Sequence, residues 1–200
     1  RGVVISSGND ASVAIAEHLA GSESAFADVM NGHAAALGMT GSHFVNSHGL
    51  PDTEHFVTAR DLALLANALI NQFPEEYSLY SEREFTYNNI RQYNRNRLLV
   101  EDPSVDGLKT GHTEEAGYCL VASAKREGMR LISVVMGTDS KRTRESESRK
   151  LLNFGFRFYQ THELYQAGEE TAVARLWKGQ QKELSLGVAE EIFLTIPRSR

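Results

Sequence analysis

Apolar residues recur at helical spacing in the first part of the chain. A first helix is predicted over residues 9 to 20, with Asn9 or Asp10 as its cap. A second helix is predicted to begin after the cap Ser22 and to stop before Gly38. The residues expected to face inward on the first helix are Val13, Ala16, Leu19 and Ala20.

A third helix is predicted where Thr58 and Asp61 form a capping box, with aspartate in the position that usually holds glutamate. Pro74 is expected to stop it. The segment before it, residues 39 to 57, is expected to be a long connection. The residues expected to face inward on the third helix are Leu62, Leu65, Ala66, Leu69 and Ile70.

The pattern then changes to one typical of strands. Residues 84–87 and 91–99 are predicted to form a hairpin around Asn88 and Asn89, because asparagine tolerates positive φ. Three further strands are predicted over residues 105–110, 117–125 and 130–137, the last being rich in β-branched residues.

A long helix is predicted over residues 141–160. Short alternating segments, 171–177 and 191–196, are expected to be strands. This change in pattern places a domain boundary near residue 162, giving domains 1–162 and 163–200.

Composition and charge narrow the classes of function. The formal net charge of −5 argues against nucleic acid as the main partner. No apolar run approaches the roughly 18 residues that a membrane helix needs. The single cysteine, Cys119, lies in an apolar run and is expected to be a buried, inert thiol.

The histidines give little support for a metal site. His43, His48 and His55 share one connection, but none of them has the H-x-x-x-H or H-E-x-x-H spacing of a helical metal site. His33 is expected to be a core or boundary residue of the second helix rather than a ligand. A metal site is therefore not expected.

Two short motifs carry candidate chemistry. Lys109-Thr110-Gly111 follows a predicted strand and would place a cation, a hydroxyl and an open backbone at the strand's end. Taken alone, the tripeptide favours a turn that closes a hairpin over a catalytic motif. Ser7-Gly8-Asn9 stands about a hundred residues upstream, just before a predicted helix. Active-site serine enzymes of the penicillin-binding and β-lactamase classes combine S-x-x-K, S-D-N and K-T-G boxes in this order.

With these motifs the chain resembles the serine-type D-alanyl-D-alanine carboxypeptidases, the low-molecular-mass penicillin-binding proteins of the type 5 and 6. The resemblance implies an α+β fold of the β-lactamase and transpeptidase kind, an antiparallel sheet flanked by helices, incomplete at the N-terminus and followed by the start of a small all-β domain. The segments that carry it are residues 6–11, 43–44, 48–50, 91–96, 106–113, 116–118, 151–158 and 194–198.

The resemblance also implies an activity. It predicts removal of the terminal D-alanine from peptidoglycan stem peptides that end in D-Ala-D-Ala, through an acyl-enzyme that β-lactams also form. It predicts a periplasmic protein held at the inner membrane by a C-terminal anchor outside this chain, and no nucleic-acid partner. It also implies that the reaction needs no metal and no organic cofactor.

By the same resemblance, Ser7 passes a proton between the nucleophile and the leaving amine, for which a hydroxyl is suited because it both donates and accepts. Asn9 would bond the substrate amide through its side chain. Lys109 would supply positive charge beside Ser7 and the substrate carboxylate.

The remaining implied roles concern substrate binding. Thr110 would bond the terminal carboxylate, and Gly111 would let the substrate lie along the strand edge. The backbone N–H of His112 would help to form an oxyanion hole. Arg144 and Arg95 would contact the peptide stem or its carboxylate, and the alternative for both is a surface role.

The nucleophile box is missing from the chain. None of the six lysines has a serine three residues before it, so we expect S-x-x-K to lie beyond Arg1 in a longer protein, and this chain alone to be inactive. Two rivals remain. A class A β-lactamase would have aspartate in place of Gly8 and a deacylating glutamate, for which we find no matching loop. A non-catalytic cell-wall-binding module would keep the groove without the nucleophile.

Overall fold

The computed structural model describes residues 1–198 and divides into two units, one covering Arg1–Asn153 and one beginning at Phe154. The first unit is built on a three-stranded antiparallel sheet of β3 (Val105–Thr113), β4 (Gly117–Arg126) and β5 (Met129–Thr138), in that order. This arrangement confirms the predicted α+β class.

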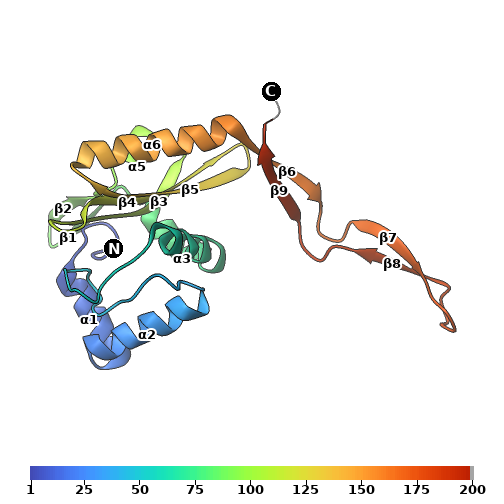
Figure 1. Cartoon of the computed structure of the whole chain (residues 1–200), viewed down its shortest axis with the longest axis horizontal. Helices are drawn as coiled ribbons and strands as arrows, with labels where there is room; N and C mark the ends of the chain where they lie inside the picture. Colours follow the sequence, from blue (N-terminus) through green and yellow to red (C-terminus); the bar gives the residue numbers. More distant parts are fainter. Residues whose placement is uncertain (199–200) are drawn as a thin grey trace. The chain divides into compact units, whose positions relative to one another are not determined.

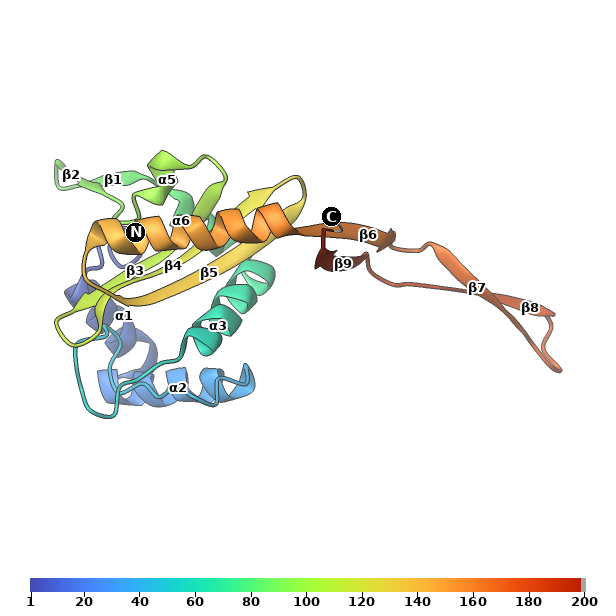
Figure 2. The same ribbon diagram turned by 45° about the horizontal axis from the view of Figure 1, so that its top comes forward.

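Helices cover both faces of this sheet. Helix α6 (Lys141–Phe158) runs along one face, and α3 (Ala59–Gln72) packs on the opposite face (Figures 1 and 2). The core between α3 and the sheet contains the buried residues Ala66, Ile70, Tyr77 and Leu108, against which Leu69, Tyr80, Val121 and Ile132 pack. Strand β3 is an edge strand, so one side of its backbone stays open to other partners.

Further elements of the first unit surround this layer. They are α1 (Asn9–Ala20), α2 (Glu23–Ala36), α4 (Pro74–Tyr77), the 3₁₀ turn Ser78–Ser81, β1 (Glu84–Tyr87), β2 (Ile90–Tyr93) and α5 (Leu98–Glu101). Strands β1 and β2 form an antiparallel hairpin whose turn residues Asn88 and Asn89 both have positive φ, as predicted.

The predicted caps are only partly correct. Ser22 Oγ accepts a hydrogen bond from Ala25 N at 3.1 Å, and Thr58 Oγ1 accepts one from Asp61 N at 3.1 Å, which confirms these two helix starts. The cap predicted at Asn9 or Asp10 is wrong, because Gly8 occupies the capping position and makes no side-chain cap.

Asp61 is buried and does more than begin a helix. Its Oδ2 accepts hydrogen bonds from Ser42 Oγ at 2.7 Å and from Gly41 N at 2.9 Å. These bonds, the one from Ser42 above all, hold the pKa of the Asp61 carboxyl below its ordinary value. Asp61 therefore ties the long connection before α3 to the helix. The predicted capping box is only half formed, because Thr58 N donates to Ser42 Oγ at 3.3 Å instead of to Asp61.

The strand predicted over residues 91–99 is too long. Strand β2 ends at Tyr93, and α5 begins at Leu98. The buried Asn96 turns the chain: its side chain donates to Gly107 O at 3.0 Å and accepts from Leu98 N at 3.2 Å. The turn lets Leu98 and Leu99 enter the core, where both are buried.

Other expectations fail where packing decides. Leu19 and Leu65, expected to face inward, are 66% and 40% exposed, and His33 is exposed rather than in the core or at its boundary. Cys119 is half-buried rather than buried, and its thiol donates to Ala116 O at 3.4 Å. Amphipathic spacing indicates which residues share a face, but the neighbours of that face decide how deeply they are buried.

The second unit consists of two antiparallel ribbons. Strand β6 (Tyr159–Tyr165) pairs with β9 (Ile192–Pro197), and β7 (Glu170–Arg175) pairs with β8 (Glu183–Gly187). Helix α6 ends at Phe158, so the helix predicted to residue 160 is slightly too long, and β6 and β8 are additional strands. The predicted boundary near residue 162 lies inside β6; residues 199–200 of the predicted second domain lie outside the described residues.

Candidate active site

The two motifs meet in the structure although 102 residues separate them. Lys109 Nζ donates a hydrogen bond to Ser7 Oγ, and another to Thr110 O at 2.8 Å. Ser7 stands in a compact turn in which its N–H bonds to Val3 O at 3.1 Å, and its φ of 56° lies in the left-handed region. Such a conformation is uncommon for a residue other than glycine and often marks a functional position.

The environment of Lys109 weakens its hold on a proton. Burial, followed by the positive charges of Arg95 and Arg144, lowers the pKa of Lys109 from 10.5 to about 8. At neutral pH the ammonium is still mostly charged, yet it gives up its proton more readily than an exposed lysine. A group with this property suits a site that handles both anions and protons.

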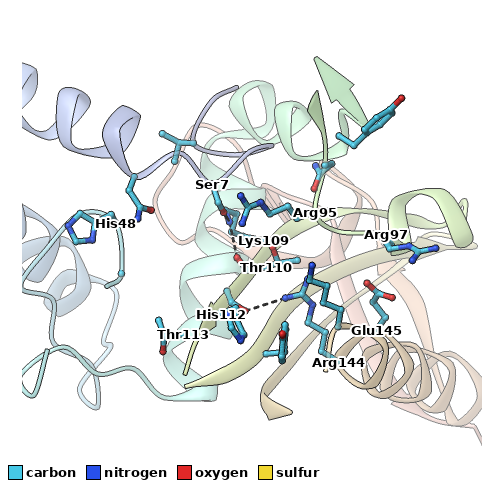
Figure 3. Close-up of a pocket in the computed structure, with 18 of the residues that line it drawn as sticks. Ser7, His48, Arg95, Arg97, Lys109, Thr110, His112, Thr113, Arg144 and Glu145 are labelled. Atoms are coloured by element: carbon cyan, nitrogen blue, oxygen red, sulfur yellow. Dashed lines mark hydrogen bonds between the residues drawn. The ribbon is translucent and has the colours of Figure 1, made fainter. Parts of the chain in front are cut away.

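A cleft of about 1160 Å³ opens in front of this pair. All eight residues that the sequence singled out line it, so the structure brings them together (Figure 3). They are Ser7, Asn9, Arg95, Lys109, Thr110, Gly111, His112 and Arg144.

Arg144 is 3% exposed and lines the cleft from helix α6. Its Nη1 donates to Gly111 O at 3.3 Å and more weakly to Cys119 O at 3.5 Å, and its guanidinium lies 5.7 Å from the centre of the Tyr118 ring. Burial lowers the pKa of Arg144. The residue therefore braces β3 against β4 while placing a positive charge beside the cleft.

The other predicted site residues make few contacts within the chain. A side chain added at Gly111 would meet only Cys119 Cβ, at an ordinary 3.7 Å, so the chain itself does not require glycine there. The role of Gly111 toward a ligand stays a prediction. The ring of His112 stacks near Tyr118 with centroids 3.9 Å apart, and Asn9 and Arg95 are exposed at the cleft.

Sequence reasoning assigned no role to several residues that line the cleft, namely Ser47, His48, Gly49, Leu50, Arg83, Tyr93, Arg97 and Glu145. His48-Gly49-Leu50 carried a signal, as part of the family resemblance. Tyr93 and Arg97 lie beside Arg95, in a run that contains several arginines, a pattern that usually indicates a solvated surface. Glu145 gave no signal, because a charged residue in the first half of α6 is expected to be solvated, yet it is 6% exposed.

Burial raises the pKa of the Glu145 carboxyl.

Among residues 1–198 no three His, Cys, Asp or Glu side chains gather in a way that would hold a metal ion. None of the helices in this part of the chain is long and apolar enough to cross a bilayer.

The chain is similar to known proteins in sequence and in fold. The chain is 51% identical over its whole length to the D-alanyl-D-alanine carboxypeptidase DacA of Escherichia coli, of which it covers 50%. Penicillin-binding protein 5 of Haemophilus influenzae superposes with a TM-score of 0.91 at 45% identity, over 98% of this chain and 58% of that one. Penicillin-binding protein D2 of Listeria monocytogenes, solved in ampicillin- and cefotaxime-bound forms, matches 78% of this chain and about two thirds of its own, at 34% identity and a TM-score of 0.72.

The chain thus spans about half the length of the curated relatives it matches. Residues 159–200 match the model of the penicillin-binding protein 5 C-terminal domain. Residues 1–140 match the D-alanyl-D-alanine carboxypeptidase family model, and this match over most of the chain shows that the protein belongs to that family.

Proposed function

We propose that this protein is a serine-type D-alanyl-D-alanine carboxypeptidase, removing the terminal D-alanine from peptidoglycan stem peptides through an acyl-enzyme. The observation that carries the proposal is the hydrogen bond from Lys109 Nζ to Ser7 Oγ in a cleft along the Lys109-Thr110-Gly111 edge. In this pair the Ser7 hydroxyl can accept and donate a proton, and it lies beside the Lys109 ammonium, whose pKa is lowered. Acyl transfer from a peptide requires such a proton-transferring group.

The open edge of β3 supplies the frame for the substrate. A peptide that adds to this edge as an antiparallel strand satisfies the free backbone groups of β3. Its terminal carboxylate then lies near the Thr110 hydroxyl and the charges of Lys109 and Arg144. The carboxylate is attracted to these cations in a partly buried site, where charges are screened less than in water.

Acylation and proton transfer follow from the same positions. The serine of an S-x-x-K segment attacks the carbonyl between the two D-alanines, and the backbone N–H of His112 helps to stabilise the oxyanion. Ser7 passes a proton to the departing amine of D-alanine, and Asn9 holds the substrate amide. Water then releases the shortened peptide from the acyl-enzyme.

β-Lactams are proposed to acylate the same serine, because a related protein has been solved in ampicillin- and cefotaxime-bound forms. We also propose that the protein works in the periplasm, at the inner membrane, held by a C-terminal anchor. What supports this location is the substrate class, since stem peptides belong to the cell wall.

The proposal is tested first by reading the coding sequence upstream of Arg1. An S-x-x-K box there supports the enzyme, and its absence favours the non-catalytic cell-wall-binding module. The protein expressed with that box should release D-alanine from diacetyl-L-Lys-D-Ala-D-Ala. The same protein with serine of the box replaced by alanine is the matched control, and equal release by both would refute the proposal.

A further inference from the structure

One wall of the cleft is a tight loop, Asn46–Leu50, which we call the lip. Gly49 has a φ of 82°, a left-handed conformation that glycine adopts without strain. Gly49 N donates to Asn46 Oδ1 at 2.7 Å, and Asn46 Nδ2 donates to Leu50 O at 3.0 Å. The Asn46 side chain thus closes the loop from both ends and fixes its curvature.

A single carboxylate anchors the lip to helix α2. Glu23 Oε1 accepts hydrogen bonds from Ser47 N at 3.0 Å and from Ser47 Oγ at 2.6 Å. These bonds lower the pKa of the Glu23 carboxyl, so it stays ionised at neutral pH. His48 Nε2 lies 3.4 Å from the same oxygen, which makes Glu23 the common partner of two successive lip residues.

His48 connects Glu23 to Leu50, the last residue of the lip. Its Nδ1 accepts a hydrogen bond from Leu50 N at 3.1 Å, while its Nε2 faces Glu23. The neutral tautomer that fits both contacts carries its proton on Nε2. Glu23 therefore orients the imidazole, and the imidazole in turn holds the backbone of Leu50.

Leu50 is the part of the lip that a ligand would meet. It lines the cleft together with Gly111 and Thr113, and half of its surface is exposed. Figure 3 shows His48 and Thr113 on one side of Ser7 and Lys109, with Arg97 and Glu145 on the other. An exposed leucine held in place at the wall of a polar cleft offers an apolar surface to one part of the ligand.

We propose that the lip selects the substrate residue that precedes D-alanyl-D-alanine by packing an aliphatic side chain against Leu50, and that Glu23 is the positioning residue for this contact. The inference rests on the proposed function. A peptide antiparallel to β3 with its carboxylate near Lys109 runs back past Gly111 and Thr113, toward the lip. Its third residue from the C-terminus then reaches Leu50.

The experiment uses isothermal titration calorimetry to measure the binding of peptides to the longer protein that carries the S-x-x-K box. The serine of that box is replaced by alanine throughout, so that no peptide is cleaved, and the protein that is otherwise wild type is the reference. Acetyl-Leu-D-Ala-D-Ala is compared with acetyl-Ser-D-Ala-D-Ala, so that only the preceding side chain differs. We expect the leucine peptide to bind about three- to tenfold more tightly, the scale of a partly buried aliphatic contact. Leu50→Ala should reduce this ratio to near one.

Glu23 variants test positioning separately from folding. Glu23→Ala removes every contact to the lip and should also bring the ratio near one. Glu23→Gln keeps an acceptor for Ser47 but loses the charge facing His48, and should retain part of the selectivity. Glu17→Ala, an exposed acid on α1, is the matched control and should keep the full ratio. A ratio unchanged by Leu50→Ala or Glu23→Ala would overturn the inference.

A diastereomer separates this failure from that of the proposed function. Acetyl-Leu-L-Ala-L-Ala should bind the reference protein much more weakly than the D,D peptide. If the D,D peptide is preferred but the lip variants leave the ratio of affinities for the leucine and serine peptides unchanged, only the inference fails. If D,D and L,L peptides bind alike, the proposed function fails and the inference falls with it.

Discussion

The sheet β3–β4–β5 and the ribbons β6–β9 and β7–β8 are all antiparallel, but they differ in how deeply their apolar side chains are buried. In β4, Leu120, Ala122 and Ala124 are at most 1% exposed. In the described part of the second unit, residues 154–198, no residue is buried. Trp177, the single tryptophan, is 79% exposed there.

This difference in burial arises because helices cover both faces of the sheet, and not because the two regions differ in composition. The three-stranded sheet is covered by α3 and α6 on opposite faces, so alternate residues of its strands face a helix on either side (Figure 1). Each ribbon has two strands, which are marginally stable when no further strand or helix covers them. The covered sheet therefore holds Lys109 of the candidate site, which lies on β3.

The largest expected effect is at the cleft edge of the sheet. Lys109→Ala in the protein that carries an S-x-x-K box should slow acylation by a fluorescent penicillin at least about a hundredfold, because a preorganised charge is lost. Lys109→Arg should retain more acylation, since it keeps the charge in a broader group. Near wild-type acylation by Lys109→Ala would show that β3 is only structural.

A matched pair of leucines tests the contrast in burial. Leu120→Ala in β4 should lower the free energy of unfolding by about 2–5 kcal/mol, because it leaves a cavity in a closed core. Leu186→Ala in β8, where the leucine is 44% exposed, should cost much less. Chemical denaturation of both variants measures the two costs, and equal losses would mean that the ribbons are as well packed as the sheet.

The depressed pKa of Lys109 predicts a pH dependence. The folded state loses this proton near pH 8, whereas the unfolded state keeps it to about 10.5. Between these values the unfolded state binds more protons, so this lysine makes folding more favourable as pH rises. Binding of acetyl-Leu-D-Ala-D-Ala should fall over the same range, as the ammonium is lost.

The control for that prediction is Lys109→Arg, whose guanidinium stays charged throughout. Its affinity for the peptide should change little from pH 7 to 9.5, while that of the wild-type chain declines several-fold. Parallel pH profiles for the two proteins would show that Lys109 does not hold the carboxylate.

The smallest effect is expected at the exposed end of the ribbons. Trp177→Ala should change the free energy of unfolding by no more than about 0.5 kcal/mol, because the side chain makes little buried contact. The guanidinium of Arg175 lies 4.6 Å from the centre of the Trp177 ring, and the loss of this cation–π contact accounts for the small decrease expected. A loss of several kcal/mol would instead indicate that Trp177 belongs to a core.

Much of the local structure follows from neighbouring residues alone. Ser22 and Thr58 begin helices because their hydroxyls reach N–H groups three residues ahead, a contact that needs no distant partner. Asn88 and Asn89 turn the hairpin for an equally local reason. The motifs around Ser7 and Lys109 indicated the chemistry, because few other sequences combine them in this order.

Only the tertiary structure decided which distant groups meet and how deeply they are buried. Ser7 reaches Lys109 across 102 residues, and Glu23 reaches the lip across 24. The burial of Glu145 and the exposure of Leu19 and His33 contradict what charge and periodicity predict. Sequence spacing fixes which residues share a face, whereas pKa, solvent exposure and hydrogen-bond partners depend on what packs against that face.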